Sequence, residues 1–73
     1  METKKEIIEK LKALENGEHL FFDMCNDGGA VAYKFKDVYL LFEIPLFGGN
    51  EVYHDTYRRS ELGGMVDVAL GWN

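Results

Sequence analysis

The sequence contains one cysteine and two histidines, which are the first candidates for nucleophilic chemistry. A cysteine nucleophile needs a base within hydrogen-bond reach. His19 and Cys25 share one face of a predicted strand, but six residues of extended chain place them about 20 Å apart. His54 can reach Cys25 only if their two strands are neighbours, which a simple meander does not provide. A half-buried structural cysteine is the favoured interpretation, and a small thiol-dependent enzyme or sensor using Cys25 is an alternative.

Metal and phosphate sites are not indicated either. The sequence has no CxxC, HxH or HExxH spacing, and His19 and Asp23 are about 13 Å apart along their strand. The glycine-rich segments NDGG, FGGN and LGGM lack the Gly-Lys-Ser/Thr that completes a phosphate loop. We therefore predict no catalytic residues, no metal site and no cofactor, and we look for the function on the surface.

The charge distribution argues against DNA or RNA as a direct partner. The net charge is −5, and residues 1–16 contribute none of it because four acids there balance four lysines. Beyond residue 16, nine acids stand against four basic residues. This excess opposes the phosphate neutralisation that drives nucleic-acid binding. A protein partner with a basic surface is favoured instead.

Length and hydropathy indicate a small cytoplasmic protein. The 73 residues suit one α+β domain spanning residues 1–73. The first ten residues, METKKEIIEK, lack the apolar core of a signal peptide, and a single cysteine excludes an intrachain disulfide. The longest apolar run, residues 38–47, is interrupted by Glu43 and Pro45 and is far shorter than the roughly 20 residues that span a bilayer. No membrane association is expected.

Two helices are predicted, one near each end. Thr3 followed by Glu6 is a capping-box pattern, and the pair Asn16-Gly17 is a stop signal. Ser60 is a candidate cap for the second helix. The apolar residues expected on the inner faces follow the helical period: Ile7, Ile8, Leu11 and Leu14 in the first helix, and Leu62, Met65, Val66 and Ala69 in the second.

Four strands are predicted between the helices. The sequence alternates with a period of two from Glu18 to Cys25, and Asn26-Asp27-Gly28-Gly29 is a hairpin signal. Further strands are expected over residues 30–35, 38–44 and 51–57. The order is therefore αββββα. We predict a four-stranded antiparallel meander with the N- and C-terminal helices packed on one face.

The strand pattern also predicts an exposed surface. If Phe22, Leu40 and Phe42 face the helices, then Phe21, Tyr39 and Leu41 lie on the opposite face, which the helices leave uncovered. Several aromatic residues on adjacent strands form the kind of patch that marks an interface. Phe47, before two glycines, either closes the edge of the core or extends this patch as an anchor.

The second helix offers another contact surface. Gly63 and Gly64 each cost about 1 kcal/mol against alanine inside a helix, so either the first turn is loose or a partner backbone approaches closely. Gly71 is expected to end this helix in a Schellman arrangement. The partner-binding residues predicted from the sequence are Phe21, Asp23, Tyr39, Leu41, Glu43, Phe47, Asp55, Gly63 and Gly64.

These features favour a non-catalytic acidic binding module. Charge would steer a basic partner to the protein, and aromatic residues would supply the contact energy. In size, acidity and αββββα order the chain resembles small proteins of phages and other mobile elements, among them anti-CRISPR inhibitors. The resemblance implies an inhibitor that blocks the nucleic-acid-binding surface of a host defence protein. The alternative is a homodimer of unknown role that uses the same face for self-association.

Overall fold

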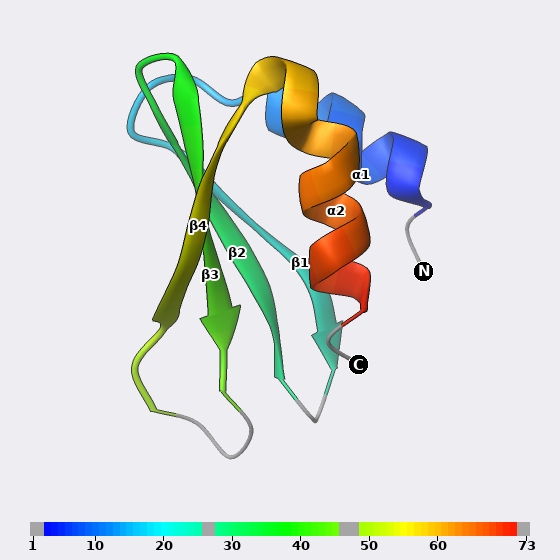
Figure 1. Cartoon of the computed structure of the whole chain (residues 1–73), viewed down its shortest axis with the longest axis vertical. Helices are drawn as coiled ribbons and strands as arrows, with labels where there is room; N and C mark the ends of the chain where they lie inside the picture. Colours follow the sequence, from blue (N-terminus) through cyan, green and yellow to red (C-terminus); the bar gives the residue numbers. More distant parts are fainter. Residues whose placement is uncertain (1–2, 26–27, 46–48, 72–73) are drawn as a thin grey trace.

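The computed structural model describes residues 3–25, 28–45 and 49–71, and the side chains of all of them except residues 23–25. The elements follow the predicted order: α1 (Lys4–Lys12), β1 (His19–Cys25), β2 (Gly28–Phe35), β3 (Val38–Ile44), β4 (Val52–Arg58), the 3-10 turn η1 (Arg59–Glu61) and α2 (Leu62–Leu70). The strands form one antiparallel sheet in the order β1-β2-β3-β4. Both helices lie on the same side of it (Figure 1). The predicted α+β meander is confirmed.

The helix α1 begins with the predicted capping box. The Glu6 backbone N–H donates to the Thr3 hydroxyl at 3.2 Å, and the Thr3 backbone N–H donates to the Glu6 carboxylate at 3.1 Å. The Thr3 hydroxyl also donates to this carboxylate, at 3.0 Å, and the two hydrogen bonds from Thr3 to the carboxylate lower the pKa of Glu6 below its ordinary value of 4.5. The helix ends at Lys12, with Ala13 as its C-cap, earlier than the Asn16-Gly17 stop signal predicts. Gly17, at φ +89°, instead belongs to the turn that leads into β1.

The helix α2 differs from the prediction at both ends. Ser60 does not cap it, because η1 intervenes and the N-cap position falls on Glu61. Gly71 is the C-cap but has φ −74°, so the left-handed turn of a Schellman motif is absent there. The predicted inner face is confirmed, and its four residues are all buried: Leu62, Met65, Val66 and Ala69.

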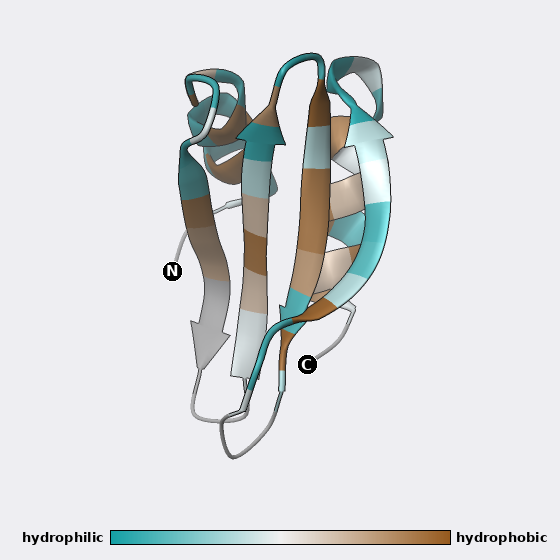
Figure 2. Cartoon of the chain, turned by 90° about the vertical axis from the view of Figure 1, so that its left-hand side faces the viewer, coloured by the Kyte–Doolittle hydropathy of each residue, from teal (hydrophilic) through white to brown (hydrophobic). Residues whose placement is uncertain are grey.

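The core lies between the helices and one face of the sheet. Its buried residues are Ile7, Leu11, Phe22, Ala30, Ala32, Tyr39, Leu41, Leu62, Met65, Val66 and Ala69. The prediction that Tyr39 and Leu41 lie on the uncovered face is therefore wrong, because both are 0 % exposed within this core. Leu40 and Phe42 alternate with them along β3 and therefore lie on the other face. We call it the outer face, and Figure 2 views the sheet from that side, with the helices behind it.

A bulge in β1 explains this reversal. Cys25 pairs with Gly28, so a regular hairpin would pair Phe22 with Val31. Phe22 pairs with Ala30 instead, because two β1 residues stand opposite one β2 residue between these pairs. A shift of one residue turns the partner strand's side chains to the other face. The pairing of β2 with β3 is regular, so the shift is passed on to β3.

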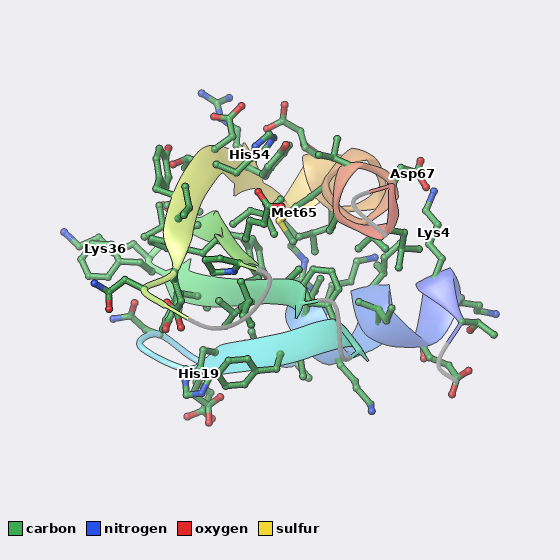
Figure 3. All side chains as sticks on the ribbon, turned by 90° about the horizontal axis from the view of Figure 1, so that it is seen from below. Lys4, His19, Lys36, His54, Met65 and Asp67 are labelled. Atoms are coloured by element: carbon green, nitrogen blue, oxygen red, sulfur yellow. The ribbon has the colours of Figure 1, made fainter. Side chains whose placement is uncertain are left out.

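Polar contacts join the helices to each other and to the strand end. The Lys4 ammonium of α1 lies 2.8 Å from the Asp67 carboxylate of α2, and the two side chains point toward each other (Figure 3). The Arg59 guanidinium of η1 donates to the Lys12 carbonyl at 3.3 Å and so satisfies a free carbonyl at the end of α1. Both contacts are at the surface, and an exposed ion pair such as that of Lys4 and Asp67 contributes about 0 to 1 kcal/mol.

Candidate binding surface

Aromatic rings from all four strands meet on the outer face of the sheet. We call this set the outer aromatic row, and its members are His19, Phe21, Tyr33, Phe42 and Tyr53. Neighbouring ring centroids are 5.1 Å apart for His19 and Phe21, 5.4 Å for His19 and Tyr33, 5.4 Å for Tyr33 and Phe42, and 5.6 Å for Phe42 and Tyr53. Most of the contacts are edge-to-face, the arrangement that aromatic pairs prefer. The row crosses the sheet from one edge to the other.

The ends of this row are open to solvent, whereas its centre is partly covered. Phe21 on β1 is 46 % exposed and Tyr53 on β4 is 53 % exposed. Between them, Val31 is fully buried although it pairs with Phe21 and Phe42 on the outer face. The centre of the outer face is therefore closed to solvent at Val31, whereas Phe21 and Tyr53 are available for contact. Exposed aromatic area of this kind on an uncovered sheet face is characteristic of binding surfaces.

A shallow hollow of about 400 Å³ opens on the same face, beside the row. We call it the outer hollow. It is lined by Gly17, Tyr33, Lys34, Phe35, Leu40, Phe42 and Glu51. The Tyr33 hydroxyl lies 3.1 Å and 2.9 Å from the two carboxylate oxygens of Glu51, to which it donates. This hydrogen bond to the carboxylate raises the pKa of Tyr33 above its ordinary value of 10.0.

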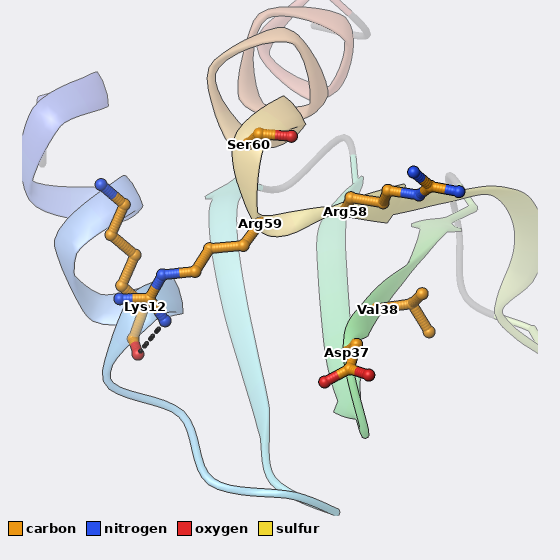
Figure 4. A pocket seen from close by; sticks show the side chains of 6 residues that line it. All are labelled: Lys12, Asp37, Val38, Arg58, Arg59 and Ser60. Carbon is orange, nitrogen blue, oxygen red and sulfur yellow. Dashed lines mark hydrogen bonds between the residues drawn. The ribbon is translucent and has the colours of Figure 1, made fainter.

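A second hollow, of about 870 Å³, lies where β4 passes into η1. Three of its six lining residues are basic, and the full lining is Lys12, Asp37, Val38, Arg58, Arg59 and Ser60. The two arginine side chains point in opposite directions, and Arg59 reaches the carbonyl of Lys12 (Figure 4). Glu61 accepts a hydrogen bond from the Arg58 backbone N–H at 2.9 Å. The positive groups do not converge on a common point, so we assign this region to the strand-to-helix junction.

The predicted partner-binding residues do not share one surface. Phe21 lies in the outer aromatic row, as expected for an exposed residue of that face. Glu43 and Asp55 are also exposed, but they belong to the helix side of the sheet, since Glu43 pairs with Ala30 and Asp55 with Leu41. Tyr39 and Leu41 are inaccessible in the core.

The remaining predicted residues lie on α2 or outside the described residues. Gly63 and Gly64 are within the helix, and Gly64 is exposed with open space where a side chain would begin. Neither glycine adjoins the outer aromatic row, because α2 lies on the other side of the sheet (Figure 1). Phe47 and the side chain of Asp23 are outside the described part of the chain, so the predictions for them stay predictions.

Five residues of the outer face were missed by the sequence reasoning. They are His19, Tyr33, Phe42, Glu51 and Tyr53. His19 alternates with Leu20 along β1 in the same way as Phe21 alternates with Phe22. The sequence pattern therefore places His19 on the same face as Phe21. The others depend on the register between strands, which changes at the β1 bulge and again between β3 and β4, where Leu41 pairs with Asp55 but Phe42 pairs with Tyr53. The excess of aromatic residues in this short sequence was the signal that a second apolar face exists.

The candidate residues for nucleophilic chemistry, His19, Cys25 and His54, all belong to the two edge strands of the sheet. β1 and β4 are opposite edges of the sheet, so Cys25 and His54 are on non-adjacent strands. Among the residues that the structure describes, no three metal-ligating side chains come together. Comparisons with protein-family models, curated proteins and solved structures found no match for this chain. None of the described helices has both the length and the apolar character needed to cross a membrane.

Proposed function

We propose that this chain is a non-catalytic protein-binding module that contacts its partner through the outer aromatic row. The observation that carries the proposal is the exposure of rings from both edge strands on the sheet face opposite α1 and α2. Aromatic side chains bring large rigid contact areas at low entropic cost, and they dominate the energetics of many interfaces. Phe21 and Tyr53, at the open ends of the row, are the expected anchors.

The partner proposed is a protein with a basic surface. Support comes from the net charge of −5, which would speed the encounter with a positively charged protein at low salt. A more specific form of the proposal is an inhibitor of a host defence protein that occupies its nucleic-acid-binding surface in the cytoplasm. It is supported by the resemblance of the chain to anti-CRISPR inhibitors in size, acidity and element order.

The experiment is a comparison of three baits in affinity capture from the source cell. They are the unchanged protein, the double variant Phe21→Ser/Tyr53→Ser, and the control variant Val68→Ser, which alters an exposed residue of α2 on the other side of the molecule. A protein retained by the unchanged bait and the control but lost by the double variant is then purified and its affinity measured directly. Equal retention by all three baits contradicts the proposal.

The same variants separate a foreign partner from a second copy of the chain. Light scattering over a wide range of protein concentration gives the molar mass in solution. A dimer that Phe21→Ser/Tyr53→Ser dissociates and Val68→Ser leaves intact would assign the outer aromatic row to self-association. A monomer at all concentrations keeps the row free for another protein.

A further inference from the structure

The outer hollow combines aromatic walls with one carboxylate. Tyr33 and Phe42 stand edge-to-face at an interplanar angle of 82°, and Phe35, which is 52 % exposed, adds a third ring. Glu51 is the acidic residue of this lining. Rings with accessible faces attract cations through their quadrupole, and a carboxylate among them adds a full opposite charge. The hollow therefore has the chemistry of a site for an organic cation.

The Glu51 carboxylate is held at the hollow and still has capacity to bind. Its two oxygens accept the Tyr33 hydroxyl at 3.1 Å and 2.9 Å, which fixes the carboxylate beside the Tyr33 ring. A carboxylate offers about four lone-pair positions, and one hydroxyl donor cannot use them all. Glu51 is exposed, so a donor arriving from solvent can reach the remaining positions.

The chain already places its own cations over aromatic rings at this end of the sheet. The Lys36 ammonium lies 5.6 Å from the centroid of Phe35, and the Lys34 ammonium lies 5.5 Å from the centroid of Tyr39. Lys34, which also lines the hollow, donates from its ammonium to the Lys36 carbonyl at 2.6 Å. The Lys34 ammonium is thus held at the turn between β2 and β3. The Tyr33 and Phe42 rings beside Glu51 therefore remain available to a cation of another molecule.

We infer that the outer hollow binds the guanidinium group of an arginine side chain on a basic partner protein. Arginine suits the hollow better than lysine, because a planar guanidinium can stack on a ring and present two N–H donors to one carboxylate. The net charge of −5 favours the approach of such a side chain. This inference rests on the proposed function and names the group of the partner that the module would recognise.

The test uses N-acetyl-arginine N-methylamide and its neutral counterpart N-acetyl-citrulline N-methylamide. Binding is followed by the NMR shifts of the Tyr33 and Phe42 rings during titration. We expect saturable shifts with the arginine amide and at least tenfold weaker binding of the citrulline amide. Equal binding of the two amides overturns the inference, as does the absence of ring shifts with the arginine amide.

Two variants with the same change of charge show whether the carboxylate acts locally. Glu51→Gln removes the charge inside the hollow, whereas Glu43→Gln removes an exposed charge on the helix side of the sheet. We expect Glu51→Gln to weaken binding of the arginine amide at least tenfold and Glu43→Gln to leave it unchanged. Equal losses in both variants would show a general charge effect and would contradict a site at Glu51.

The outcomes distinguish this inference from the proposed function. If a captured partner depends on Phe21 and Tyr53 but the arginine amide does not bind the hollow, the module stands and the guanidinium site is wrong. If the arginine amide binds but no protein depends on Phe21 and Tyr53, the site stands and the proposed module is wrong.

Discussion

The hydroxyl of Tyr33, on β2, donates to the carboxylate of Glu51, which directly precedes β4, although β3 lies between these two strands. The contact spans the outer face above Leu40 and Phe42, which line the same hollow. It therefore fixes the start of the edge strand relative to the centre of the sheet. Tyr53, two residues after Glu51, is one end of the outer aromatic row. The contact between Tyr33 and Glu51 therefore also positions one end of the proposed binding surface.

Replacing Glu51 by glutamine should lower the pKa of Tyr33 toward 10.0. The carboxylate raises this pKa through its hydrogen bond to the hydroxyl and its charge, and both are weakened in Glu51→Gln. Because the folded-state pKa is raised, the contribution to the free energy of unfolding is complete below pH 10.0 and is lost as the pH rises through the raised value. Ring carbon shifts of Tyr33 in an alkaline NMR titration measure the change.

Tyr57 provides the internal control for that titration. Its pKa is raised mainly by burial, and then by the charges of Asp55 and Glu61. Glu51→Gln should therefore leave the pKa of Tyr57 unchanged. Equal shifts of Tyr33 and Tyr57 would show that the substitution perturbs the fold instead of one hydrogen bond.

Replacing Tyr39 by phenylalanine should raise the free energy of unfolding by about 1 kcal/mol. The Tyr39 hydroxyl is buried and has no hydrogen-bond partner among the described residues, and such a group keeps its desolvation penalty. Tyr33→Phe is the matched control, since it removes a hydroxyl that is bonded to Glu51 and should lower stability by about 0.5 kcal/mol. Urea unfolding measures both, and a clear loss of stability in Tyr39→Phe would reveal a partner for its hydroxyl.

Replacing Gly28 by alanine should lower the free energy of unfolding by more than about 2 kcal/mol, because two penalties combine. Gly28 has φ +116°, and an added Cβ would lie 2.5 Å from the backbone oxygen of Ile44. Gly49 has a similar φ of +110° with nothing within 4 Å of that position, so Gly49→Ala should cost only about 1 kcal/mol. Equal unfolding midpoints for the two variants would mean that the close approach of β2 and β3 relaxes at little cost.

Replacing Gly64 by alanine should raise the free energy of unfolding by up to about 1 kcal/mol. Gly64 lies inside α2 and is exposed, and an added Cβ meets nothing within 4 Å. Thermal unfolding followed by circular dichroism measures the gain. A captured partner that binds Gly64→Ala as tightly as the unchanged protein would exclude close backbone approach at this glycine, whereas a stabilised variant that no longer binds would support it.

Most of the fold could be predicted because local signals and packing agree. Thr3 and Glu6 form the predicted capping box, and the helical period correctly placed Leu62 and Met65 in the core. The outer aromatic row could not be predicted in the same way. β3 is apolar on both faces, so its period of two does not say which face meets the helices. The β1 bulge decides which face of β3 meets the helices. Neither Phe22 nor its neighbours in the sequence indicate that a bulge forms there.

The β1 bulge also has a consequence for how this sequence tolerates insertions and deletions. A chain with one residue fewer between Phe22 and Cys25 could pair regularly with β2, and Phe22 would still stand opposite Ala30. With the pairing of β2 and β3 kept, Leu41 would stay in the core and Phe42 would stay on the outer face. A single codon lost at the bulge would thus preserve both surfaces of the sheet, whereas the full-length chain paired without the bulge would exchange them.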